Sequence, residues 1–222
     1  ASQRQTVEVL APTEWGGVRV LPELLAAFVR PNSAALVPLL ATAAATLQRD
    51  SGDAALSGYQ SRDPQRVVTM VRALYGAVQT AGVTYINPPA SFEESGQKVR
   101  SHEQVLAGTM GTCLDLTVLL AALCEQAGLH PLLLIVRGHA FPGVWLTDFS
   151  LQEPTLDDPR PILKRVELGE ALVFDSSAVA QGAAFDVARK VAEGYLRNDT
   201  AFVAAIDVRC ARAHAILPLP LD

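Results

Sequence analysis

The segment from Thr112 to Val136 constrains the fold more than any other part of the chain. Residues 112–126 carry leucines at helical spacing, and Gly128 follows them as a helix terminator. Five consecutive apolar residues, Leu132 to Val136, come next, and a run of this kind predicts a buried strand. We therefore expect a helix that packs against a sheet.

Further helices and strands are expected on both sides of this segment. Gly138 turns the chain into a second strand over 139–146, in which Pro142 and Gly143 indicate a bulge or an edge position. Residues 147–170 are acidic and contain prolines, which predicts an irregular excursion. The other expected strands cover 6–10, 83–86, 171–174 and 202–208, and the other expected helices cover 21–29, 34–48, 63–82, 103–106 and 185–196. The pattern predicts an α+β protein with a mostly helical part over 1–82 and a core over 83–222.

Length and charge exclude several classes of protein. The 222 residues, half of them apolar, are enough to bury a core. No apolar run reaches the ~18 residues of a membrane span, and the first residues do not have the pattern of a signal peptide. The 23 acidic and 18 basic side chains give a net charge of −5, which argues against direct binding of nucleic acid. We expect neither a membrane nor a nucleic acid as a direct partner.

The three cysteines argue against a disulfide framework and against a structural zinc site. Their number is odd, and none of them forms a CxxC pair. A reducing cytoplasm is the simplest compartment for such a chain. An unpaired cysteine in an intracellular protein also raises the possibility of a nucleophile that works with a histidine elsewhere in the sequence.

Cys113 is the best candidate for that nucleophile. Thr112 is a good N-cap, and Asp115 three residues later completes a capping box, so Cys113 is expected at the first helical position. The positive end of the helix dipole favours a thiolate there. Gly111 has no side chain to block the approach of a substrate.

A base and an orienting acid are available downstream. His139 is expected at the start of a strand next to the cysteine helix, where its ring could reach the sulfur. Asp175 is expected where the third strand ends, and its carboxylate could hold the other ring nitrogen.

Other cysteines, acids and histidines are expected to have structural roles and no role in catalysis. Cys124 and Cys210 are expected to be buried small side chains. Asp115 lies about 200° around the helix from the sulfur, so we expect it only to cap. The other histidines, His102, His130 and His214, are expected on the surface or in loops.

These motifs resemble the core of the bacterial transglutaminase-like superfamily. The resemblance rests on Gly111–Thr117, Leu123, Ala127–Leu129 and Gly138–Phe141. It implies a papain-like Cys-His-Asp arrangement, with the cysteine on a helix N-terminus and the histidine and acid on adjacent antiparallel strands. An aromatic residue is usual two positions after the histidine, and Phe141 fills that position.

A narrower group is similar over almost the whole length. It comprises transglutaminase-like segments embedded in large bacterial proteins that also carry superfamily-I helicase-like modules. The matching motifs are Trp15–Gly17, Leu21–Leu24, Pro31–Asn32, Gly58–Gln60, Asn87–Glu93, Gly96–Arg100, Gly138–Leu146 and Ala205–Arg209. By this resemblance the chain is one compact unit excised from a larger protein.

The resemblance leaves the acid and the oxyanion donors open. The broad superfamily often places its acid about fifteen residues after the histidine, whereas the narrower group keeps it in the later strand. Asp175 is therefore the first choice and Asp148 the alternative. An oxyanion hole would use the backbone N–H of Cys113 and a side chain from the preceding segment, with Gln97 the best candidate and Tyr85 and Asn87 weaker ones.

The implied chemistry is acyl transfer from an amide through a thioester, with no cofactor or metal. A protein or peptide would be the substrate, and the outcome would be proteolysis, deamidation or cross-linking. The competing interpretation is a catalytically silent domain that uses the same cleft to bind a peptide or another module of its parent protein. A role as a nucleic-acid accessory domain is suggested only by the helicase-like modules that accompany such segments. The net negative charge of the chain argues against direct binding.

Overall fold

The computed structural model of the chain describes residues 11–220, and its centre is a five-stranded antiparallel sheet. The strands lie in the order β7-β9-β5-β6-β8. Their bounds are β5 Pro131–Val136, β6 His139–Trp145, β7 Thr155–Leu156, β8 Ala171–Val173 and β9 Phe202–Asp207. Short strands pair outside this sheet: β1 (Glu14–Trp15) antiparallel with β3 (Gln97–Lys98), and β2 (Thr84–Tyr85) parallel with β4 (Met110–Gly111). The expected α+β class is confirmed, while the strand predicted at 6–10 lies outside the described residues.

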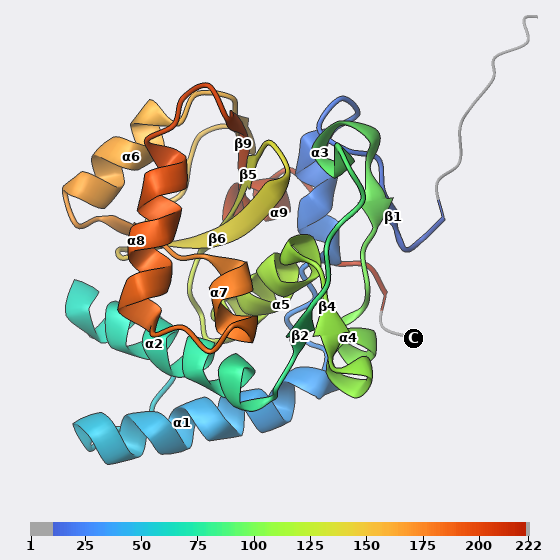
Figure 1. Cartoon of the computed structure of the whole chain (residues 1–222). Helices are drawn as coiled ribbons and strands as arrows, with labels where there is room; N and C mark the ends of the chain where they lie inside the picture. The colour runs from blue at the N-terminus through green and yellow to red at the C-terminus, as the bar shows by residue number, and fades with distance from the viewer. Residues whose placement is uncertain (1–10, 221–222) are drawn as a thin grey trace, which may run out of the picture.

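Helices cover both faces of the sheet (Figure 1). The helix α5 (Cys113–Gln126) packs on β5 and β6, and α6 (Arg160–Glu167) and α8 (Phe185–Leu196) lie on the opposite face. Along β5, Leu133 and Ile135 join the core that contains α5, while Leu132 and Leu134 join the core under α6 and α8. Because successive side chains of a strand point to opposite faces, a strand covered on both sides is apolar at every position.

The sequence of α5 explains its place at the centre of the molecule. Every residue from Cys113 to Cys124 is buried, as expected for a helix that is apolar all round. At its end, Gly128 adopts a φ of 75°, and the Leu129 N–H donates to the carbonyl of Cys124 at 2.9 Å. This helix end turns the chain directly into β5. Because α5 also packs on β5 and β6, the whole helix is fixed relative to the sheet.

The remaining helices pack around this centre. They are η1 Pro22–Phe28, η2 Ala34–Leu36, α1 Val37–Ser51, α2 Pro64–Thr80, α3 Phe92–Ser95, α4 His102–Gly108, α7 Ser176–Ala180 and α9 Val208–Ala213. Figure 1 shows α1 beside α2, and α2 in turn contacts α5. The main core includes Leu74 of α2 together with Ile206 of β9, so the helical N-terminal part and the sheet share buried side chains. None of the helices in the described part of the chain is long and apolar enough to cross a membrane.

The bulge or edge position predicted at Pro142 and Gly143 is wrong, because β6 lies between β5 and β8 and is not an edge strand. The register of β6 against β5 runs without a shift from Val144 to His139, with Pro142 opposite Leu133. The carbonyl of Pro142 accepts from the Phe174 N–H, on the β8 side. A residue in an antiparallel ladder directs its N–H and its C=O to the same neighbouring strand. The N–H that Pro142 lacks would therefore point to the chain just beyond the paired part of β8.

The excursion predicted over residues 147–170 is also wrong in part. It contains the strand β7 and the helix α6, which places Ile162 in the core. Pro161 sits in the first turn of α6, where a proline costs no hydrogen bond. The first predicted helix is a 3-10 helix, η1, instead of an α-helix.

Candidate active site

Cys113 is the first residue of α5, and its side chain is fully buried. The Thr112 hydroxyl accepts from the Asp115 N–H at 3.3 Å, and the Asp115 carboxylate accepts from the Thr112 N–H at 2.9 Å. This reciprocal cap leaves the N–H of Cys113 without an acceptor inside the helix. The thiol therefore lies at the positive end of the helix dipole, beside a backbone donor.

The capping role predicted for Asp115 is confirmed, and the structure adds a partner that the sequence did not indicate. The buried carboxylate also accepts from the backbone N–H of Arg100 at 2.8 Å and from its guanidinium at 2.9 Å. Arg100 thus compensates the charge of an acid whose side chain is wholly buried. The helix start is held by side chains from two segments of the chain.

His139 and Asp175 contact each other directly. The Nε2 atom of His139 lies 2.6 Å from Oδ1 of Asp175. His139 begins β6, and Asp175 follows the adjacent strand β8, where it caps the short helix α7. The carboxylate also accepts from the N–H and the hydroxyl of Ser177, at 3.2 Å and 2.8 Å. Since Nε2 is engaged by the acid, Nδ1 is the nitrogen left to face the thiol.

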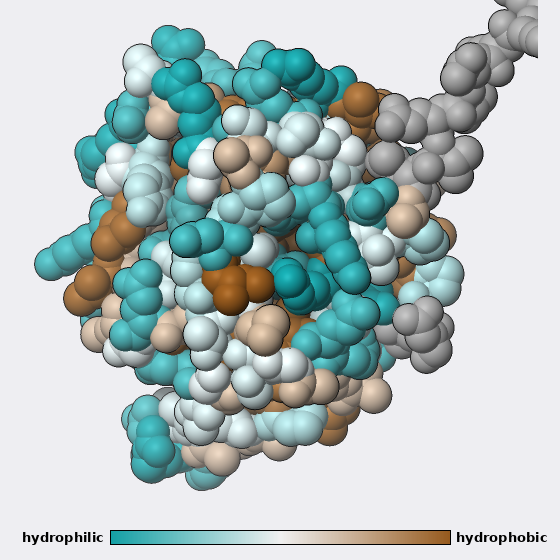
Figure 2. Space-filling model, turned by 45° about the vertical axis from the view of Figure 1, so that its right-hand side comes forward, coloured by the Kyte–Doolittle hydropathy of each residue, from teal (hydrophilic) through white to brown (hydrophobic). Residues whose placement is uncertain are grey.

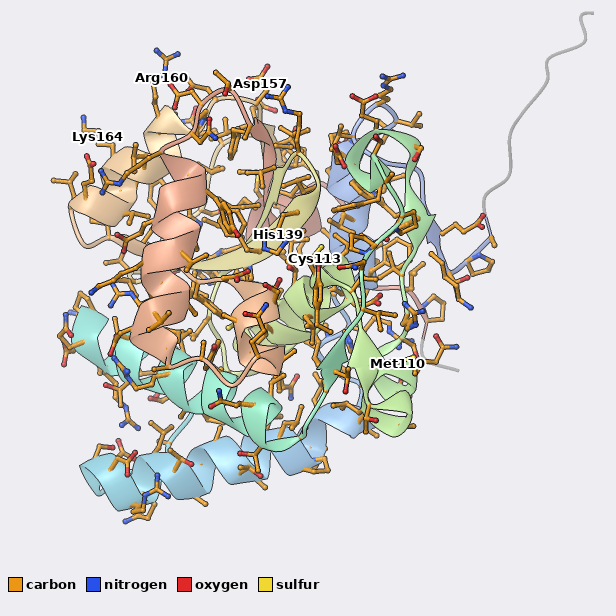
Figure 3. The ribbon with its side chains drawn as sticks, in the orientation of Figure 1. Met110, Cys113, His139, Asp157, Arg160 and Lys164 are labelled. Carbon is orange, nitrogen blue, oxygen red and sulfur yellow. The ribbon has the colours of Figure 1, made fainter. Side chains whose placement is uncertain are left out.

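The protonation of this group of residues is set by their contacts. Burial lowers the pKa of His139. Hydrogen bonds with Asp175 and Cys113 and the charges of both residues raise it by more, so the resulting pKa is about 9. Burial raises the pKa of Asp175. Hydrogen bonds from His139 and Ser177, together with the charge of His139, bring that pKa below its usual value. Figure 3 shows Cys113 and His139 side by side where α5 meets β6. The arrangement favours an imidazolium next to the sulfur at neutral pH.

Two tyrosines border the site. Burial raises the pKa of Tyr85 above its usual range, and the charge of Cys113 and a hydrogen bond with its sulfur raise it more. The ring of Tyr195, from α8, lies 5.1 Å from the ring of His139 between centroids. Tyr85 was a weak oxyanion candidate in the sequence. Tyr195 was missed, because α8 approaches His139 only through the packing of the sheet.

Gln97 lies next to the residue that precedes Cys113. Its side chain is almost fully buried, and Nε2 is 3.4 Å from the Thr112 hydroxyl. Among the described residues its Oε1 has no hydrogen-bond partner. The structure therefore brings an amide with an unused polar atom to the start of α5. Asn87 is exposed and lines a cavity beside Gln97.

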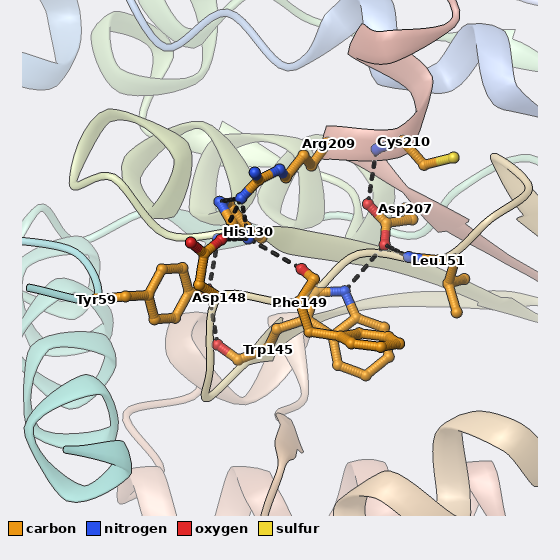
Figure 4. A network of polar contacts seen from close by, with 9 residues as sticks. All are labelled: Tyr59, His130, Trp145, Asp148, Phe149, Leu151, Asp207, Arg209 and Cys210. Atoms are coloured by element: carbon orange, nitrogen blue, oxygen red, sulfur yellow. Dashed lines mark hydrogen bonds and ion pairs between the residues drawn. The ribbon is translucent and has the colours of Figure 1, made fainter. Parts of the chain in front are cut away.

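Asp148, the alternative acid, lines a cavity together with Gln126 at the other end of α5. Figure 4 shows it beside His130 and Arg209. Its carboxylate is 2.5 Å from the Arg209 guanidinium and 3.7 Å from Nδ1 of His130, and its side chain is 65% exposed. The acid beside His139 is Asp175.

The other cysteines and histidines take structural positions. Cys124 and Cys210 are buried, and burial raises the pKa of Cys124 to about 12. The expectation that His102 lies on the surface or in a loop is wrong. It is buried in the first turn of α4, where its Nε2 accepts from the Arg30 N–H at 3.3 Å. The part of the chain that the structure describes holds no cluster of three or more His, Cys, Asp and Glu side chains suited to a metal ion.

Comparisons with known proteins give one distant structural likeness to report. No protein-family model matches this sequence, and neither does any curated protein. A crystal structure of a putative protease from Parabacteroides distasonis ATCC 8503 is similar over 70% of this chain, with 16% sequence identity and a TM-score of 0.34. The chain spans 29% of the length of that protein.

Proposed function

We propose that this protein is a cysteine-dependent amide hydrolase or acyl transferase of the transglutaminase-like type. The observation that carries the proposal is the contact of 2.6 Å between His139 Nε2 and Asp175, next to a thiol at the N-terminus of α5. Acyl transfer of this kind needs a nucleophile, a base and an acid that orients the base, and Cys113, His139 and Asp175 would take these three roles. The sequence resemblance supports the same assignment.

In the proposed reaction the proton of the Cys113 thiol resides on Nδ1 of His139. The sulfur attacks the amide carbonyl carbon, and the C–N bond breaks as His139 delivers its proton to the leaving nitrogen. Water then adds to the thioester and returns a proton to His139, and the C–S bond breaks to give a carboxylic acid and the Cys113 thiolate beside protonated His139. An amine in place of water gives a new amide, which is the cross-linking outcome. Asp175 keeps the ring oriented and stabilises its charged form.

The oxyanion of the tetrahedral intermediate would be held by the backbone N–H of Cys113 and the side-chain amide of Gln97. The first donor is supported by its place at the start of α5, where no intrahelical acceptor exists. The second is supported by the burial of Gln97 beside Thr112. Donors fixed in place before the reaction stabilise the developing charge without reorganisation.

One observation favours a second candidate, a catalytically silent domain that binds a peptide or another module of its parent protein. Cys113 has no exposed surface, so a substrate carbonyl reaches the sulfur only after neighbouring side chains move. A domain of this kind would keep the fold and the cleft without turnover.

Alkylation with labelled iodoacetamide at mildly acidic pH separates these candidates. Both thiols are buried, so the raised pKa of Cys124 makes it an internal control, and mass spectrometry should find Cys113 modified much faster. The same protein should cleave or deamidate members of a random peptide library, and Cys113→Ala should not. Equal, slow modification of both cysteines would contradict an activated thiol. Fast modification of Cys113 without any turnover would favour the silent domain.

A further inference from the structure

A cavity of about 400 Å³ lies beside the start of α5. Gln97 and Thr112 form part of its wall, and residues 86–89 and the chain around Lys98 and Arg100 complete it. Thr112 directly precedes Cys113, and Gln97 contacts the Thr112 hydroxyl. Cys113 itself does not line the cavity, so a group that occupies it would lie beside the residue that precedes the nucleophile.

The charged side chains that line this cavity are cationic. They are Lys98 and Arg100, and none of the described Asp or Glu residues lines it. Lys98 is exposed and forms no ion pair within residues 11–220. Glu14 lies opposite Lys98 in the β1–β3 ladder, but its carboxylate accepts from the Ala11 N–H.

Arg100 is only partly engaged. One terminal nitrogen of its guanidinium bonds Asp115 at 2.9 Å, and its side chain is 29% exposed. A guanidinium has five N–H donors, so others are available to a ligand. The positive end of α5 adds to the field at the same place. Figure 2 turns the side of the molecule that carries β2, β3 and β4 toward the viewer, where hydrophilic side chains border a small apolar patch.

We infer that this cavity is a subsite for a carboxylate of the substrate, next to the amide that reacts. The inference rests on the proposed function and narrows its substrates to peptides that carry an acidic side chain or a chain-terminal carboxylate at this position. Lys98 supplies a mobile cation for the carboxylate, and Arg100 supplies directional donors. The cavity's volume has room for a side chain of this size, and Asn87 and Gln97 are among the residues that line it.

Peptide vinyl sulfones that alkylate the thiol test the subsite. Each probe has one residue on each side of the electrophile. One of these two positions carries Glu, and the matched control probe carries its neutral isostere Gln at the same position. The Glu probe should label Cys113 about fivefold faster than the Gln probe, which is the size expected for one partly exposed ion pair. This preference should shrink at high salt, because exposed charges are screened. Lys98→Glu should abolish or invert it. Lys164→Glu, an exposed change on α6 far from Cys113 in Figure 3, should leave it unchanged.

A binding experiment keeps the subsite distinct from the chemistry. Calorimetry with the Cys113→Ala protein should show tighter binding of an unreactive Glu peptide than of its Gln counterpart. A peptide pair with a free or an amidated C-terminus distinguishes a terminal carboxylate from a side chain. Equal binding and equal labelling of the Glu and Gln forms, or a preference that survives Lys98→Glu, would overturn the subsite. Tighter binding of the Glu peptide without labelling by any probe would support the subsite and contradict the proposed chemistry.

Discussion

The two ends of α5 each hold a histidine near an aspartate, and the two pairs behave in opposite ways. The side chains of His139 and His130 are similarly buried, at 13% and 15% exposure. His139 donates to Asp175, and its pKa rises to about 9. Burial lowers the pKa of His130, and the Arg209 guanidinium beside Nε2 lowers it further, against the effect of the Phe149 carbonyl. Equal burial is accompanied by pKa shifts in opposite directions, so the charge of the nearest partner decides which histidine is protonated at neutral pH.

The largest expected effect comes from removing one histidine or the other. His139→Ala should lower any amidase activity by about 10³-fold, because general acid–base catalysis contributes on this scale. His130→Ala should leave activity within about twofold, since it stands among structural contacts at the far end of α5. Initial rates with a cleaved peptide measure both. Comparable losses in the two variants would remove the distinction between the two ends.

Exchange of the two acids sharpens the same comparison. Asp175→Asn should cost about 10²-fold or more in rate, because the ring loses its orienting charge. The matched change Asp148→Asn removes an exposed carboxylate and should have little effect. Activity near that of the wild type in Asp175→Asn would mean that another acid does this work.

The two cysteines of α5 separate chemistry from folding. Cys113→Ala should abolish labelling and turnover while it changes the free energy of unfolding by less than about 1 kcal/mol, because few atoms are lost. Cys124→Asn should destabilise by about 2 kcal/mol or more, because it buries an amide in an apolar site. Thermal melts of both variants decide the matter. A Cys113→Ala melting point as low as that of Cys124→Asn would mean that Cys113 serves the packing of the core and would contradict its assignment as the nucleophile.

The smallest effect is the dependence of stability on pH. The pKa of His139 is raised from 6.5 to about 9, so its stabilising contribution is complete below pH 6.5 and is lost as the pH rises toward 9. The pKa of His130 is lowered, so protonation below pH 6.5 favours the unfolded chain. NMR titration of the ring signals should place His139 above and His130 below 6.5. Two titrations that coincide would contradict the assignment of partners.

Local sequence signals account for much of the fold. The cap at Thr112, the terminator Gly128 and the apolar run of β5 predict α5 and its neighbouring strand correctly. The helix α8 also begins and ends where its periodicity predicts. By contrast, the acidic and proline-containing composition of 147–170 concealed α6 and β7, because a short helix depends on the sheet to bury its few apolar residues.

The site was predictable only as far as local motifs and the resemblance reach. Those motifs single out Cys113 and His139, and the end of a predicted strand singles out Asp175. The partnership of Arg100 with Asp115 and the position of Tyr195 beside His139 join residues from different elements of the fold. No spacing rule in a single sequence encodes such contacts. The cation-lined cavity at Lys98 was hidden for the same reason.

The pH dependence of Cys113 alkylation, compared between the wild type and Asp175→Asn, tests the central claim most directly. In the wild type, protonated His139 beside the sulfur should support rapid reaction with iodoacetamide down to about pH 6. In Asp175→Asn the imidazolium loses its carboxylate, so the reaction should slow at that pH and approach the wild-type rate only under alkaline conditions. Identical profiles for the two proteins, or a wild-type Cys113 that reacts no faster than Cys124 at any pH, would contradict a Cys113–His139–Asp175 catalytic site.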